Sequence, residues 1–110
     1  AASQVLNASG LPARLMIDAS HANSSKNPEN QPKVVEDIAH QLENGETRIV
    51  GVMVESHLVG GRQDLLPGCE LTYGQSITDG CIGWDSSVQV LERLASAVRA
   101  RRMRRIAEAA

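Results

Sequence analysis

Aromatic side chains are almost missing from this sequence, which has no Phe, one Trp and one Tyr among 110 residues. Its core must therefore be aliphatic, and it is poor in the stacking platforms that bind single-stranded nucleic acid. The two cysteines, Cys69 and Cys81, show no CxxC spacing, which favours a reducing compartment over a disulfide framework. A formal net charge of −2 gives no general attraction for nucleic acid or anionic lipid. We therefore expect neither a nucleic-acid nor a membrane partner.

Long apolar runs are also missing. No stretch approaches the length of a membrane span and no signal peptide opens the chain, so we expect a cytoplasmic protein. A hydrophobic content of 42% nevertheless suits a folded core. The first residue is Ala rather than Met, which we interpret as a sign that the natural start is missing.

Two segments, Arg14–Ala19 and Arg48–Glu55, read as strands whose apolar residues are consecutive, as in strands covered on both faces. Between them, a helix is expected to begin near Pro32 and to end at Asn44-Gly45. Its apolar stripe is Val34, Val35, Ile38, Ala39 and Leu42.

Two further helices are expected at the ends of the chain. The first segment reads as the last turns of a helix closed by Gly10. After a long polar and Gly-rich loop over 56–84, Asp85 or Ser86 is expected to cap a final helix. The apolar face predicted for that helix is Val88, Leu91, Ala95 and Val98.

This alternation of helices and strands predicts crossover connections and an α/β fold with a parallel sheet. Two buried parallel strands cannot stand alone, because each needs neighbours for its backbone groups on both sides. We therefore interpret residues 1–110 as the C-terminal part of one larger domain, with no separate second domain.

In a parallel sheet all strands end on one side, and ligands bind there. Asp18–His21 and Glu55–His57 each follow a predicted strand, and the later loop adds Asp79 in "GQSITDG". His, Glu and Asp side chains that meet at one edge can bind a divalent cation such as Mn, Fe, Co or Zn. The alternative is that the same residues are strand-end caps and solvated loop charges, and spacing alone favours this alternative while leaving the metal site open.

Two other functions can be weighed from the residues. Ser20 or Ser56 with a histidine and an acid would suggest a hydrolase, but the G-x-S-x-G elbow is absent. A basic C-terminal helix would suit a non-catalytic interaction domain, although cations near a helix C-terminus are ordinary surface residues. Its arginines are Arg99, Arg101, Arg102, Arg104 and Arg105.

Several long motifs carry a resemblance to a known family. "MIDASHANSSK", "GVMVESHL", "GRQ", "LTYGQSITDGCIGW" and "LASAVRARR" are similar, in this order, to the C-terminal part of class I 3-deoxy-D-arabino-heptulosonate 7-phosphate (DAHP) synthases. The resemblance runs from Gly10 to Arg102. It implies a (β/α)8 TIM barrel of which this chain holds the last two strands and their helices.

The resemblance also implies an activity and its partners. The family condenses phosphoenolpyruvate with erythrose 4-phosphate and releases phosphate, as a metal-dependent transferase at the start of the shikimate pathway. We expect this of the full-length protein, as a homo-oligomer, and not of the fragment. The alternative within the same chemistry is another metal-dependent barrel enzyme that condenses phosphoenolpyruvate with a different aldose.

Site residues follow from the same motifs. His21, Glu55 and Asp79 would be the metal ligands, with His21 and Asp79 also catalytic. The family's fourth ligand is a cysteine upstream, which neither Cys69 nor Cys81 matches. Lys26 and Arg62 are the remaining candidates for substrate phosphate, although the residues themselves favour a loop surface charge for each. Supporting donors around the ligands would be Asn23, Ser24, Ser25, Ser56 and His57.

Overall fold

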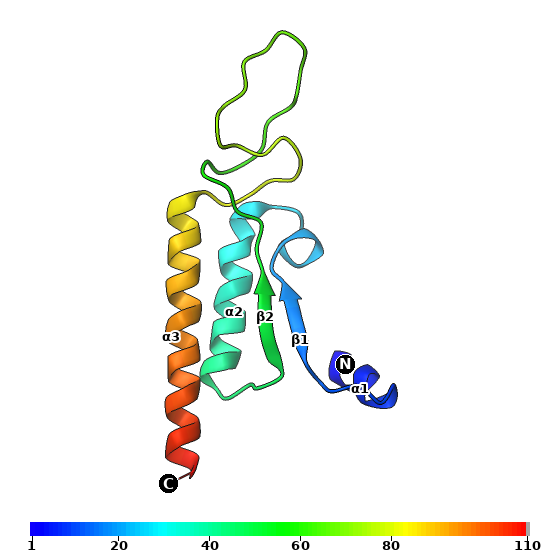
Figure 1. The fold of residues 1–110 in the computed structure, drawn as a ribbon, viewed down its shortest axis with the longest axis vertical. Helices are drawn as coiled ribbons and strands as arrows, with labels where there is room; N and C mark the ends of the chain where they lie inside the picture. Colours follow the sequence, from blue (N-terminus) through cyan, green and yellow to red (C-terminus); the bar gives the residue numbers. More distant parts are fainter. Residues whose placement is uncertain (110) are drawn as a thin grey trace.

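The computed structural model describes residues 1–109 as an α/β arrangement with two parallel strands. Both strands and the helix between them lie where the sequence predicts them. The elements in chain order are α1 (Ala2–Ala8), β1 (Leu15–Asp18), the 3-10 turns η1 (His21–Ser24) and η2 (Pro28–Asn30), α2 (Gln31–Glu43), β2 (Ile49–Met53) and α3 (Trp84–Ala109). Strand β1 pairs with β2 in parallel, so both point their carboxyl ends upward in Figure 1.

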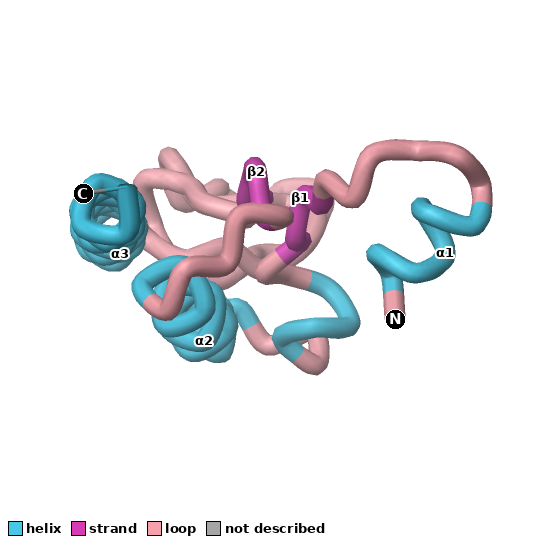
Figure 2. Tube along the Cα trace, turned by 90° about the horizontal axis from the view of Figure 1, so that it is seen from below, coloured by secondary structure: helices cyan, strands magenta, loops and turns pink. Residues whose placement is uncertain are grey.

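The helix α2 covers one face of the strand pair, and α3 packs beside it (Figure 2). Val35, Ile38 and Leu42 of α2 are buried at one helix face, as the predicted stripe requires. Ile38 and Leu42 pack with Ile49 of β2 and Ala97 of α3 in one aliphatic cluster, and Val35 belongs to a second cluster with Ile82 and Val90. Burying each large aliphatic side chain contributes roughly 1.5–3 kcal/mol. The core therefore fixes α2 relative to the ends of both strands.

The opposite face of the strand pair is open. Met16 of β1 is 70% exposed and Val50 of β2 is 63% exposed. The prediction that both faces would be covered is therefore not met within residues 1–109. In the part of the chain that the structure describes, α2 and α3 lie on the same side of the strand pair (Figure 2).

Two predictions for the last helix are wrong. The helix begins at Trp84, so Asp85 lies within its first turn rather than capping it, and the first-turn partner is the Gly83 carbonyl, which accepts from Ser87 N–H (3.0 Å). The predicted apolar face is also shifted, because Leu91 is 63% exposed while Val90 is buried. Residues 87, 90, 94 and 97 form the inner face instead.

Three arginines of α3 form hydrogen bonds or ion pairs with α2 and the segment that follows it. Arg101 Nη1 donates to the Glu46 carbonyl (3.0 Å), and Arg104 Nε donates to the Glu43 carbonyl (3.1 Å). Farther up the helix, Arg93 pairs with Glu36 (2.8 Å) and with Glu43, and these hydrogen bonds hold the pKa of both glutamates below its usual value. These contacts fasten α3 to α2.

Within the described residues, no helix combines the length and apolarity needed to cross a membrane.

The connection over 56–83 rises beyond the carboxyl ends of the strands and returns to them (Figure 1). Its two arms are tied together by the reciprocal backbone bonds of Gly61 and Cys81 (2.8 and 3.1 Å). At its base, Gly60 and Gly83 approach so closely that a Cβ on Gly83 would lie 3.2 Å from Gly60 N. The returning arm is anchored by Ile82, which is buried in the core.

Candidate metal centre

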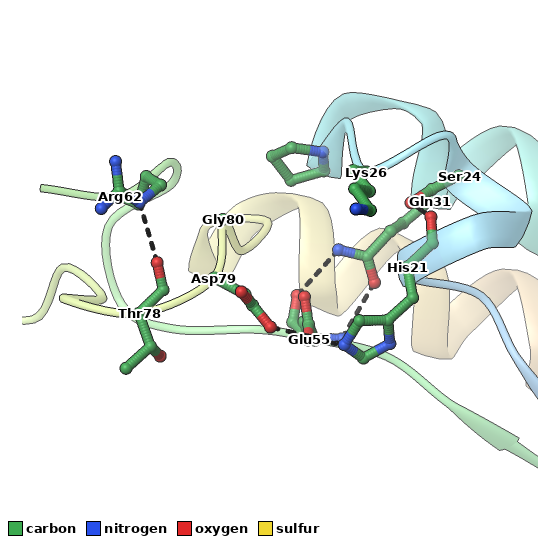
Figure 3. A pocket seen from close by; sticks show the side chains of 10 residues that line it. His21, Ser24, Lys26, Gln31, Glu55, Arg62, Thr78, Asp79 and Gly80 are labelled. Carbon is green, nitrogen blue, oxygen red and sulfur yellow. Dashed lines mark hydrogen bonds and ion pairs between the residues drawn. The ribbon is translucent and has the colours of Figure 1, made fainter.

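Three side chains from separate segments meet at the carboxyl end of the strand pair. His21 follows β1, Glu55 follows β2, and Asp79 comes from the returning arm of the long loop (Figure 3). One ligand atom from each lies within 4.8 Å of the other two. His21 Nε2 is 3.0 Å from Glu55 Oε1 and 3.4 Å from Asp79 Oδ2. The structure thus brings together the three residues that the sequence singles out.

The imidazole of His21 is held from behind by the end of β1. Its Nδ1 lies 2.9 Å from Asp18 Oδ2 and 2.8 Å from Ser20 Oγ. Ser20 is buried and donates both its N–H (2.8 Å) and its hydroxyl to Asp18 Oδ1. His21 itself has a φ of 50°, an uncommon conformation for a residue other than glycine. Such backbone geometry is typical of positions that the surrounding structure constrains.

Both ring nitrogens of His21 therefore face carboxylate oxygens, which can only accept hydrogen bonds. A neutral imidazole carries a single N–H and would leave one nitrogen lone pair against a carboxylate. The arrangement is satisfied when both nitrogens are protonated, or when Nδ1–H faces Asp18 and Nε2 faces a cation. In agreement, the hydrogen bond to Asp18 and then the charge of Glu55 raise the pKa of His21. Hydrogen bonds from Ser20 and His21 lower the pKa of Asp18.

This donor set fits a divalent cation. Imidazole nitrogen suits Zn, Cu, Fe and Ni, and carboxylates suit Mg, Ca and Mn, so a mixed set favours the borderline first-row metals. The two carboxylates would offset the charge of a divalent ion, and His21 Nε2 lies within 3.4 Å of an oxygen of each. The Asp18–His21 contact matches the carboxylate partner that orients metal-binding histidines in general.

A cavity of about 340 Å³ opens beside these three side chains and contains both predicted phosphate-binding cations in its lining. Lys26 lies on the wall formed by the loop after η1. Arg62 lies across the cavity, with Nε donating to the Thr78 carbonyl (2.8 Å) and Nη2 paired with Asp64 (2.8 Å). Arg62 therefore braces the loop that carries Asp79.

The five predicted supporting residues separate into two groups. Asn23 donates to the Asp18 carbonyl (2.7 Å), and the buried Ser24 donates to the His21 carbonyl (3.1 Å), so both shape the backbone around the imidazole. Ser25 only ends η1, in a left-handed conformation. Ser56 pairs with a hydroxyl of α3, and His57 Nδ1 accepts from the next residue's N–H (2.8 Å). Within residues 1–109, the side chains of these last three make no hydrogen bond to a side chain of the metal-ligand candidates.

The sequence did not single out Gln31, which is fully buried and hydrogen-bonded to the main chain of Glu55. A glutamine before Pro32 at the start of a helix carries no periodic or motif signal. For Asp18, the position at the end of a strand was a usable signal, but its pairing with His21 was not predicted.

A family model and similar curated proteins indicate the same family for this chain. The model of the DAHP synthetase I family matches residues 1–92. The Phe-sensitive phospho-2-dehydro-3-deoxyheptonate aldolase of Escherichia coli K12 is 57% identical over 97 residues, covering 88% of this chain and 28% of that protein. The tyrosine-inhibited aldolase of Schizosaccharomyces pombe is 55% identical over 101 residues, covering 88% of this chain and 27% of that protein.

A solved structure gives the same result at the level of the fold. The phospho-2-dehydro-3-deoxyheptonate aldolase of Francisella tularensis superimposes with a TM-score of 0.75 and 46% sequence identity. The match covers 80% of this chain and 25% of that one. The chain thus spans roughly a quarter of the length of the relatives it matches.

Proposed function

The chain belongs to the DAHP synthetase I family, and from this premise we propose that the full-length protein containing it is a DAHP synthase. It condenses phosphoenolpyruvate with erythrose 4-phosphate and water to give DAHP and inorganic phosphate. The observation that carries the proposal is the meeting of His21, Glu55 and Asp79 beside a cavity at the strand ends. Each of the three lies in a motif that carries the family resemblance.

We further propose that these three side chains hold one divalent metal ion. When bound, such an ion supplies a Lewis acid that polarises the aldehyde oxygen of the sugar. Asp18 Oδ2 accepts a hydrogen bond from His21 Nδ1–H, so the neutral ring keeps its proton on Nδ1. The unprotonated Nε2 then offers its lone pair to the metal. Glu55 and Asp79 contribute the charge that balances the cation, and the more exposed Asp79 is also open to contact with the aldose. Lys26 faces the cavity as a cation for a substrate phosphate.

We propose that the two strands belong to a closed (β/α)8 barrel whose remaining part covers the surfaces left open here. Met16 and Val50 on the open sheet face would then point into the barrel. The exposed side of α3, with Trp84, Leu91 and Ile106, would contact a neighbouring part of the barrel. Two strands leave unpaired edges, and a barrel removes both of them.

The direct test uses the full-length protein with each of Mn²⁺, Fe²⁺, Co²⁺ and Zn²⁺ after removal of bound metal. We expect loss of phosphoenolpyruvate together with release of one phosphate for each erythrose 4-phosphate consumed. A pentose 5-phosphate in place of erythrose 4-phosphate serves as the comparison. Consumption of the pentose phosphate alone would favour the alternative condensing enzyme, and no turnover with any metal would defeat the proposal.

A further inference from the structure

Gln31, the first residue of α2, is a polar side chain with no exposed surface. Its amide makes two hydrogen bonds to the main chain of Glu55, 24 positions away in the sequence. Glu55 N–H donates to Gln31 Oε1 (2.9 Å), and Gln31 Nε2 donates to the Glu55 carbonyl (3.1 Å). Both bonds can be followed in Figure 3. Buried polar groups in folded proteins are hydrogen-bonded, and both hydrogen bonds of the Gln31 amide go to the main chain of Glu55.

The main chain of Glu55 needs this partner because the contact between the two strand segments has already ended. Ala19 N–H donates to the Met53 carbonyl (2.8 Å), and the chain after β1 then turns into η1. An amide side chain offers one donor and one acceptor in the same arrangement as a peptide group. Gln31 therefore takes the place that a further residue of β1 would have filled.

The same carbonyl joins a third segment. Ile82 N–H also donates to the Glu55 carbonyl (3.0 Å), so both of its lone pairs are used. Ile82 is three residues after Asp79 and anchors the returning arm of the loop in the core. The Glu55 peptide thus connects α2, the end of β2 and the arm that delivers Asp79.

We infer that Gln31 is a positioning residue for Glu55. By holding N–H and carbonyl of Glu55 together, its amide fixes the direction in which the carboxylate leaves the strand toward His21 and Asp79. Val35, one turn along the same face of α2, is buried in the core cluster that also contains Ile82, and it makes no hydrogen bond to Glu55. This inference rests on the proposed function, because it concerns the carboxylate assigned there to the metal.

The test is Gln31→Met in the full-length protein, since Met has nearly the same length and neither a donor nor an acceptor at the end of its side chain. We expect the affinity for Co²⁺, measured by competition with a chelator, to fall about tenfold or more, as for other partners of metal ligands. The visible absorption bands of bound Co²⁺ should also change, since the Glu55 carboxylate is no longer held in one direction.

Two variants control for other effects. Gln41→Met makes the same chemical change at an exposed position of α2. Val35→Ala destabilises the core next to Gln31 without removing a bond to Glu55. Both should keep the wild-type Co²⁺ affinity and spectrum at a temperature where all variants are folded. A Gln31→Met variant that behaves like Val35→Ala, with lower stability but unchanged Co²⁺ affinity and spectrum, would overturn the inference.

A second measurement needs no variant and remains decisive if Gln31→Met does not fold. Amide hydrogen exchange at Glu55 in the wild-type protein should be as slow as in the core of α2, and exchange as fast as in an exposed loop would contradict the pairing. Co²⁺ binding by wild-type protein without any DAHP formation would defeat the proposed function and leave this test intact. Catalysis by the wild type with unaltered Co²⁺ affinity in Gln31→Met would defeat the positioning role alone.

Discussion

Replacing Asp18 by Asn tests how the site fixes the proton on His21. Asp18 Oδ1 accepts two donors, the N–H and the hydroxyl of Ser20. In the Asn variant we expect the amide oxygen to stay at this place, because an NH₂ group there would face the Ser20 N–H, which can only donate. The amide NH₂ then occupies the position of Oδ2, 2.9 Å from His21 Nδ1, and donates to it.

That donation selects the wrong tautomer of the imidazole. Nδ1 becomes an acceptor, so the neutral ring carries its proton on Nε2, the nitrogen 3.0 Å from Glu55 Oε1. A cation then has to displace this proton and break the new hydrogen bond. We expect Asp18→Asn to weaken metal binding about a hundredfold, the upper end of the range for partners of metal ligands. Asp18→Ala leaves the choice of tautomer open and should cost only about tenfold. The isosteric change is thus expected to do more damage than the truncation.

The assay is chelator competition for the metal in the full-length protein, together with the ¹⁵N shifts of the His21 ring in the metal-free state. Asp37→Asn, an exposed aspartate of α2, is the matched control and should leave affinity and shifts unchanged. Metal affinity in Asp18→Asn equal to that of the wild type, or higher than in Asp18→Ala, would refute the tautomer argument.

Four further outcomes are expected. Ala in place of His21, Glu55 or Asp79 should lower both metal content and turnover, with Asp79→Asn milder than Asp79→Ala because an amide oxygen still coordinates; unchanged metal stoichiometry in Glu55→Ala would show the ligand assignment to be wrong. Because the pKa of His21 is raised, metal affinity should fall about tenfold for each pH unit below that pKa, as one proton must leave; affinity that stays flat down to pH 5 would contradict this. Ile38→Ala should cost about 2–5 kcal/mol of stability in chemical denaturation, since Ile38 is 2% exposed in the core. Residues 1–110 expressed alone should be inactive and self-associate in size-exclusion chromatography, whereas a monomer with protected amides and tight metal binding would contradict the fragment interpretation.

The meeting of the candidate ligands could be predicted because it follows from topology. Consecutive apolar residues identified both strands, and parallel strands necessarily end on one side. His21 and Glu55 follow those ends, so their proximity needed no knowledge of packing. Asp79 was placed by its motif, and its position depends on backbone bonds within the long loop that composition does not reveal.

Gln31 and Asp18 illustrate what such reasoning misses. Their roles depend on which atoms remain unpaired after the strands have formed. The need for Gln31 arises only because the contact between the two strands ends at the Met53 carbonyl, one pair before the Glu55 peptide. No property of a single segment contains this information, since the donor and the acceptor lie 24 residues apart.

The error on α3 has a different physical origin, because this helix carries two apolar faces. Val90 and Ala97 are buried against α2 and the sheet, while Trp84 and Leu91 lie on an exposed side. Apolar periodicity identifies a face that avoids water but does not say which neighbour covers it. The predicted stripe combined Leu91 and Ala95 from the exposed side with Val88 and Val98, which are half-buried. This exposed apolar side of α3 would be covered in the proposed barrel. The misassigned face is thus an independent reason to expect more chain around these two strands.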